Sequence, residues 1–206
     1  MGSHILGPVN VAWKQGTERF HRSQSLLDFR VDDFWKWSGA DLLSNTMRGL
    51  VAEFLVACDL GVTDQPRVEW NAFDLMTREG AKVEVKSAAY LQSWWQDRHS
   101  DIRFGIASTK GWNRETNKSD EMSMRQADVY VFALLATKDK ARVDPLDVEQ
   151  WEFYILLTET LNSAIPDQRT IGLTTLRRLD AKRAAFGGIA NVIESLAPKG
   201  EASTSQ

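Results

Sequence analysis

The sequence of 206 residues is poor in cysteine, histidine and long hydrophobic runs. Its single cysteine, Cys58, excludes an internal disulfide and a cysteine-rich zinc site, and it fits a reducing, cytoplasmic environment. Three histidines argue against a histidine-rich metal centre. Because no stretch approaches the ~18 consecutive apolar residues that cross a bilayer, we expect no membrane partner. The formal net charge of −3 excludes a uniformly positive surface, but it does not exclude a local basic groove.

Apolar residues are plentiful, at 43% of the chain, which is enough for one ordinary core. The patterning predicts three parts: an N-terminal helical extension over 1–42, a folded domain over 43–196, and a disordered polar tail over 197–206. Tryptophan is frequent, and four of the eight lie between positions 70 and 112.

The clearest predicted element is an amphipathic helix over 43–59, with apolar residues at three- and four-residue steps. Asp41 or Ser44 is the expected N-cap, and Gly61 is placed to end the helix. Glu53 lies on the flank of the apolar stripe. Strands are predicted over 67–75, 81–87, 102–108, 128–137 and 151–157, a polar loop over 109–121 and a helix over 173–185. This order predicts an α/β fold in which a central mixed β-sheet of about five strands is flanked by helices.

The first two of these strands form a predicted hairpin, and its turn determines which of their residues face each other. Arg78-Glu79-Gly80 suits a three-residue turn with Gly80 in the left-handed conformation. Counting outward from that turn places Asp74 opposite Glu84, with Cβ atoms about 4.5–5.5 Å apart, and puts Lys86 on the same face as Glu84. Opposed carboxylates repel, and bound Mg²⁺ would resolve the conflict, because it prefers one or two carboxylates with waters and phosphate. Two carboxylates and a lysine around a metal suit phosphodiester cleavage.

Asp74 followed, after nine residues, by Glu84-Val85-Lys86 resembles the motif of the PD-(D/E)XK nuclease superfamily, also called restriction-endonuclease-like. The resemblance implies an αβββαβ core, which residues 43–137 would supply within a nuclease-like domain over 43–196. It also implies that Asp74, Glu84 and the Val85 carbonyl bind the divalent metal and that Lys86 is catalytic.

Two further positions match residues found in members of that superfamily. Glu53, in RGLVAEFLVA, matches the metal-directed glutamate that many members carry on the preceding helix, although it could equally be a helix-flank charge paired with Arg48. Gln92 matches a glutamine that some members carry after the lysine, with a catalytic role. The sequence departs from the motif at Ala72-Phe73, where the name-giving proline is absent.

Two segments are candidates for contact with nucleic acid. Tyr90, with Trp94 and Trp95, could stack on bases, or these aromatic residues could belong to a helix packed on the sheet. The segment 109–121 interleaves basic and aromatic residues, as a phosphate-tracking loop would, although it could also be an ordinary solvated connection. Its candidate contacts are Lys110, Trp112, Arg114 and Lys118.

These patterns together predict a Mg²⁺-dependent endodeoxyribonuclease, with Mn²⁺ as a substitute, acting in restriction, anti-phage defence or DNA repair. RNA is left open as a second substrate. One such site cuts one strand at a time, so a double-strand break would need a homodimer or two binding events. The alternatives are a catalytically inactive nucleic-acid-binding module on the same fold and a protein-interaction module whose tryptophans form the binding face.

Overall fold

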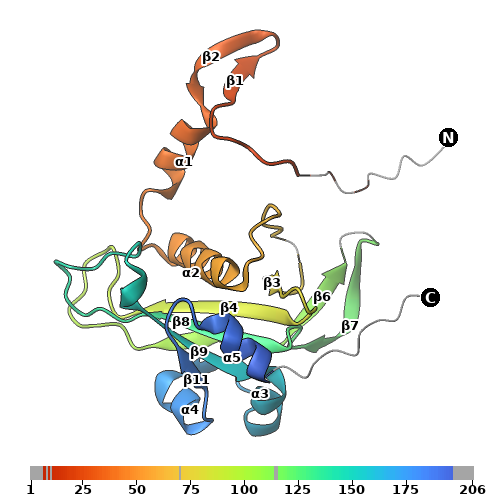
Figure 1. The fold of residues 1–206 in the computed structure, drawn as a ribbon, viewed down its shortest axis with the longest axis vertical. Coiled ribbons are helices and arrows are strands. Elements are labelled where there is room, and N and C mark those ends of the chain that lie inside the picture. The colour runs from red at the N-terminus through yellow and green to blue at the C-terminus, as the bar shows by residue number, and fades with distance from the viewer. Residues whose placement is uncertain (1–6, 8, 10, 70, 114–115, 197–206) are drawn as a thin grey trace.

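The computed structural model describes residues 7, 9, 11–69, 71–113 and 116–196, and the expected tail at 197–206 lies outside these ranges. Within them, an α/β body carries an N-terminal arm that projects away from it (Figure 1). The sequence predicts a helical extension here, but only part of the arm is helical. Strands β1 (Arg19–Arg22) and β2 (Ser25–Arg30) form a hairpin before helix α1 (Val31–Gly39). No helix in the described ranges is long and apolar enough to cross a membrane.

A five-stranded mixed sheet, in the order β11-β9-β8-β4-β3, forms the centre of the body. Its strands are β3 (Leu75–Met76), β4 (Lys82–Ala89), β8 (Val129–Leu135), β9 (Trp151–Leu157) and β11 (Lys182–Ala184). Strands β4 and β8 are parallel, and the other neighbours are antiparallel. The expected fold class, a central mixed sheet of about five strands flanked by helices, is confirmed.

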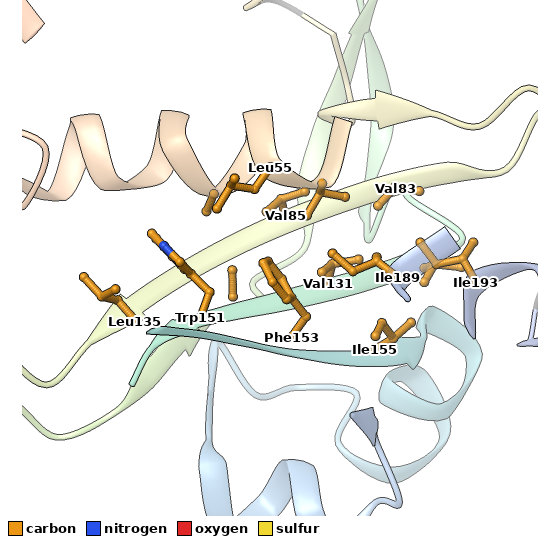
Figure 2. Close-up of a cluster of buried hydrophobic side chains, with 14 of the residues drawn as sticks. Leu55, Val83, Val85, Val131, Leu135, Trp151, Phe153, Ile155, Ile189 and Ile193 are labelled. Atoms are coloured by element: carbon orange, nitrogen blue, oxygen red, sulfur yellow. The ribbon is translucent and has the colours of Figure 1, made fainter. Parts of the chain in front are cut away.

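Helices cover both faces of this sheet. Helices α2 (Asn45–Leu60) and α5 (Ile189–Leu196) pack on one face, over side chains that include Val85, Val131 and Phe153 (Figure 2). Helices α3 (Thr158–Ala164) and α4 (Leu173–Arg178) contribute to the cluster on the other face, around Phe104 and Phe132. All seven residues of β8 are buried, as a continuous apolar run predicts for a strand covered on both sides.

Helix α2 begins and ends as its sequence predicts. The Ser44 hydroxyl accepts a hydrogen bond from the Met47 N–H at 3.3 Å. Gly61 ends the helix in the left-handed conformation, at φ +64°, where a side chain would be strained. The helix therefore presents a fixed register, in which Glu53 is buried with Ala52 and Val56 while Phe54 is exposed.

The connection between β4 and β8 differs most from expectation. An αβββαβ order places a helix there, but the described residues of this connection form three short strands instead. Strand β5 (Arg103–Gly105) pairs with β10 (Thr170–Gly172) outside the central sheet. The segment predicted as a polar loop over 109–121 folds largely as a hairpin of β6 (Thr109–Asn113) and β7 (Lys118–Met124). A parallel crossover requires only a sufficiently long connection, and strands satisfy that requirement here.

Two other sequence predictions are wrong in part. Among the described residues of the strand predicted over 67–75, only Leu75 lies in a strand, β3 (Leu75–Met76), although the partner strand β4 continues to Ala89. The helix predicted over 173–185 ends at Arg178, and Asp180 takes a left-handed conformation at φ +57°. The chain then returns as β11 along the edge of β9.

Candidate functional site

The β3–β4 hairpin has the register predicted from its turn. Leu75 pairs with Val83, the Thr77 N–H donates to the Ala81 carbonyl at 2.9 Å, and Gly80 has φ +91°. Continuing this register by one residue places Asp74 opposite Glu84.

Asp74 lies where the short ladder ends, and β4 fixes its carboxylate. The Val85 N–H donates to Asp74 Oδ2 at 2.8 Å, and the Asp74 N–H donates to the Val83 carbonyl at 3.1 Å. The N–H and C=O of one strand residue point toward the same side. The Val85 carbonyl therefore lies on the same edge of β4 as the Asp74 carboxylate.

Glu84 and Lys86, two positions apart on β4, form an ion pair. Their side chains are 17% and 34% exposed. Burial raises the pKa of Glu84, the charges of Asp74 and Glu53 raise it further, and Lys86 opposes the shift. A carboxyl that is buried beside other carboxylates gains from a nearby cation, and shifted groups of this kind cluster at functional sites.

Glu53 approaches this group from α2, with 8% of its surface exposed. It pairs with Arg67 and not with Arg48: Arg67 Nε donates to both carboxylate oxygens, at 2.8 and 2.9 Å. Burial raises the pKa of Glu53; the bond from Arg67 opposes that rise, and the charge of Asp74 adds to it. Glu53 also interacts electrostatically with Lys86. The structure therefore brings four of the predicted site residues together: Glu53, Asp74, Glu84 and Lys86.

Gln92 is a different case. Ala89, the last residue of β4, lies five positions beyond Glu84, which is about 17 Å along the strand. Beyond that end, the Gln92 side chain accepts a hydrogen bond from Arg48 Nη1 at 3.0 Å and donates to Ser100 Oγ and to the Ala89 carbonyl. Gln92 is 6% exposed, and these bonds give it a structural task away from the carboxylates.

A pocket of about 600 Å³ joins the carboxylates to the β6–β7 hairpin. Asp74 and Glu84 line one side of it, and Lys110 and Trp112 line the other. Its remaining lining residues are Glu69, Asn71, Ala72, Phe73, Thr109 and Ser119. Two of the four candidate contacts from the segment 109–121 thus reach the candidate site. Lys118 is exposed beside the lining residue Ser119, and Arg114 lies outside the described residues.

The aromatic residues after β4 do not join this pocket. Tyr90 lies beyond the far end of β4, where Lys138 Nζ sits 4.5 Å from its ring centroid. Trp94 and Trp95 are 52% and 87% exposed, in a segment without helix, so the alternative of a helix packed on the sheet is wrong.

Two residues of the site carry no signal in the sequence. Arg67 falls in a segment that resembles an ordinary strand, and only tertiary structure brings it to Glu53. Tyr130 stands opposite Glu84 in the parallel ladder of β4 and β8. Burial, together with the charge of Glu84, raises the pKa of Tyr130 to about 12.

The donor set fits a cation that takes few protein ligands. Among the described residues, no group of three or more His, Cys, Asp or Glu side chains is arranged to hold a metal ion. Asp74, Glu84 and the Val85 carbonyl nevertheless offer oxygen atoms along one strand edge, beside an open pocket. Mg²⁺ commonly takes one or two carboxylates and completes its shell with waters and substrate phosphate.

Comparison with known proteins gives one match. The family model for Bacteriophage T4 endonuclease IV matches residues 28–173, which contain every site residue described above. No curated protein and no solved structure matches the chain. The matched region is more than half of the 206 residues. The chain therefore belongs to the Bacteriophage T4 endonuclease IV family, a family of nucleases.

Proposed function

We propose that this protein is a metal-dependent endonuclease of the PD-(D/E)XK type that hydrolyses phosphodiester bonds in DNA. The observation that carries the proposal is the β3–β4 hairpin, in which Asp74 and Glu84 oppose each other at an open pocket and Lys86 is paired with Glu84. Membership of an endonuclease family supports the same reaction.

In this proposal, Asp74, Glu84 and the Val85 carbonyl hold Mg²⁺, with Mn²⁺ as a substitute. When bound there, such an ion would supply charge stabilisation at the phosphate and would make the attacking water easier to ionise. Water attacks the phosphorus in line and gives up a proton to solvent, one P–O bond forms, the bond to the leaving oxygen breaks, and that oxygen takes up a proton from solvent. The Lys86 ammonium, now paired with Glu84, stabilises the negative charge that develops on the phosphate oxygens.

Glu53 and Arg67 border this centre. As a paired carboxylate, Glu53 does not compete for the lysine, and Arg67 brings a second cation close to the carboxylates. Glu53 becomes a further metal ligand if substrate draws Arg67 away, since phosphate is also a strong partner for a guanidinium.

Nucleic acid would enter along the β6–β7 hairpin. Lys110 and Lys118 supply positive charge for the backbone, and Trp112, which is 36% exposed at the pocket, offers a stacking surface. Arg114 belongs to the same proposed contact. Tyr90 lies about 20 Å along the strand from Glu84, so it would contact a more distant part of the substrate.

The proposed cellular roles are restriction, anti-phage defence or DNA repair, with a homodimer serving double-strand cleavage and with RNA as a second possible substrate. The runner-up function is a catalytically inactive nucleic-acid-binding module. It is favoured by the two ion pairs, Glu84–Lys86 and Glu53–Arg67, which neutralise much of the site without a metal.

Cleavage of supercoiled plasmid in Mg²⁺, with EDTA as the control, separates these functions. We expect nicking that requires the metal and that falls at least about 100-fold in Lys86→Ala, the usual cost of removing a group that stabilises a transition state. Glu79→Gln, an exposed acid in the turn of the same hairpin, is the matched control and should cut like the parent. Binding without cleavage of DNA or RNA, in either metal, would establish the inactive module instead.

A further inference from the structure

Tyr130 lies on β8 beside Glu84, one of the proposed metal ligands. The two residues are paired in the parallel ladder of β4 and β8, and neighbouring strands lie about 4.8 Å apart. Tyr130 is 3% exposed, and its ring packs on that of Phe132 with the centroids 5.7 Å apart and the planes 22° from parallel. The phenol is therefore held in a fixed place next to Glu84.

The hydroxyl of Tyr130 has no hydrogen-bond partner among the residues that the structure describes. Tyr154, on the neighbouring strand β9, has the same 3% exposure, but its hydroxyl donates to Glu152 Oε2 at 2.6 Å. Buried polar groups are normally paired, because leaving water without gaining a new partner costs free energy. The Tyr130 hydroxyl therefore has a donor capacity that the packing of the fold leaves unused.

Glu84 supplies a nearby acceptor. Its carboxylate pairs with Lys86 through Oε1, and among the described residues no donor binds Oε2. Burial and the charge of Glu84 raise the pKa of Tyr130 to about 12; the charge of Asp74 adds to the rise, and that of Arg125 opposes it. Tyr130 is thus a neutral hydrogen-bond donor at pH 7, within electrostatic reach of both carboxylates.

We propose that Tyr130 is a positioning residue, whose hydroxyl donates to one oxygen of the Glu84 carboxylate and turns the other oxygen toward the divalent metal. The inference rests on the proposed function, since it assigns a task at the same site. A hydrogen bond of this kind fixes the rotation of a ligating carboxylate, and removing such a partner typically weakens metal binding about 10–100-fold.

A neutral donor suits a metal-binding Glu84 better than its present cationic partner does. In the proposed reaction Lys86 serves the phosphate, so the tyrosine hydroxyl replaces it as the donor to Glu84. An ammonium group beside a metal ligand also repels the metal ion, whereas a phenol holds the carboxylate without adding a charge. Glu84 lines the pocket and Tyr130, although described, does not, so Tyr130 acts on the reaction through Glu84.

Binding of Mn²⁺ by the full chain without DNA, measured by electron paramagnetic resonance, tests this role apart from catalysis. Tyr130→Phe removes only the hydroxyl and should weaken the binding at least about tenfold. Tyr154→Phe is the matched control and should bind like the parent, because it makes the same change at an equally buried position, on a strand that does not adjoin β4. Unchanged affinity in Tyr130→Phe, or an equal loss in both variants, overturns the proposal.

Stability in EDTA separates positioning from a structural role. Because the Tyr130 hydroxyl has no partner among the described residues, Tyr130→Phe should keep or raise the urea midpoint of the parent. Tyr154→Phe should lower the midpoint, since Glu152 loses its donor. A clear fall in the midpoint for Tyr130→Phe would show that the hydroxyl supports the fold itself, against the proposal.

Plasmid nicking then locates the effect in the use of the metal. Tyr130→Phe should need at least about tenfold more Mg²⁺ for half of its maximal rate, and its rate at saturating Mg²⁺ should approach that of the parent. A lower maximal rate with unchanged Mg²⁺ dependence would place the hydroxyl on the substrate and overturn the proposal. A parent that binds Mn²⁺ but cuts neither DNA nor RNA defeats the proposed function alone, because the Mn²⁺ titration still measures the role of Tyr130. A parent that binds no Mn²⁺ overturns both.

Discussion

Replacing Glu84 with glutamine should make the metal-free protein more stable. Glu84 is largely buried, and its register neighbour across the hairpin is Asp74. Two unit charges about 5 Å apart repel by about 3 kcal/mol at an effective dielectric constant of 20. The ion pair with Lys86 offsets part of this repulsion, so we expect Glu84→Gln to gain about 1–2 kcal/mol at pH 7, which is about 3–6 °C in Tm for a domain of this size.

The pH dependence of this gain has a definite sign. Burial in the folded protein raises the pKa of Glu84 above its ordinary value, so the folded state binds the proton more tightly than the unfolded state. The parent therefore loses stability as the pH rises through the folded pKa, whereas the glutamine variant does not. The gap between the two proteins should be absent below about pH 4 and constant above the folded pKa.

Thermal denaturation in EDTA, followed by circular dichroism from pH 4 to pH 8, measures this gap, with Glu79→Gln as the exposed control. Saturating Mg²⁺ should then reverse the order, because a ligand at 100 times its Kd stabilises the parent by about 2.7 kcal/mol and finds no complete site in the variant. A glutamine variant that is less stable than the parent at pH 7 without metal would refute the repulsion argument. A difference in stability between the two proteins that does not change with pH would also refute it.

Three other predictions concern the surroundings of the site. Arg67→Ala leaves the buried Glu53 carboxylate without its partner and should cost about 1–3 kcal/mol by urea denaturation at pH 7, with a smaller loss at pH 4; an equal loss at both values would contradict it. Trp112→Ala should weaken the binding of single-stranded oligonucleotides by about 1–3 kcal/mol, measured by anisotropy in Ca²⁺, and unchanged affinity would remove Trp112 from the contact surface. Phe153→Ala empties a fully buried position and should cost about 3–5 kcal/mol, and a cost near zero would contradict the packing of Figure 2.

Local patterns predicted the elements that short-range chemistry determines. The β3–β4 register follows from the turn at Gly80 and the two-residue period of a strand, and α2 follows from its caps and spacing. The β6–β7 hairpin escaped prediction because its sequence is polar and its pairing has an irregular register between Lys110 and Trp112. No local pattern could show that Tyr130, in a strand far along the chain, would stand beside Glu84.

Local patterns also could not predict the bonding partners of Glu53, on helix α2, and of Gln92, beyond the end of β4. Spacing placed Glu53 on the flank of the apolar stripe, and the course of the chain after α2 decides that its partner is Arg67. Gln92 follows Lys86 as a glutamine follows the lysine in some members of the PD-(D/E)XK superfamily. The strand runs on to Ala89, however, and carries Gln92 away from Glu84 to a bond with Arg48.

The β6–β7 hairpin forms a two-stranded sheet of its own, separate from the central sheet that holds the carboxylates. Two hairpins therefore line the pocket. The β3–β4 hairpin belongs to the central sheet, whereas β6 and β7, among the described strands, pair only with each other. Insertions, deletions and substitutions in the second hairpin can reshape the wall around Lys110 and Trp112 without displacing Asp74 or Glu84. If the carboxylates carry the proposed reaction, this arrangement lets substrate preference diverge while that reaction is retained, so related chains should differ most in length and composition between β6 and β7.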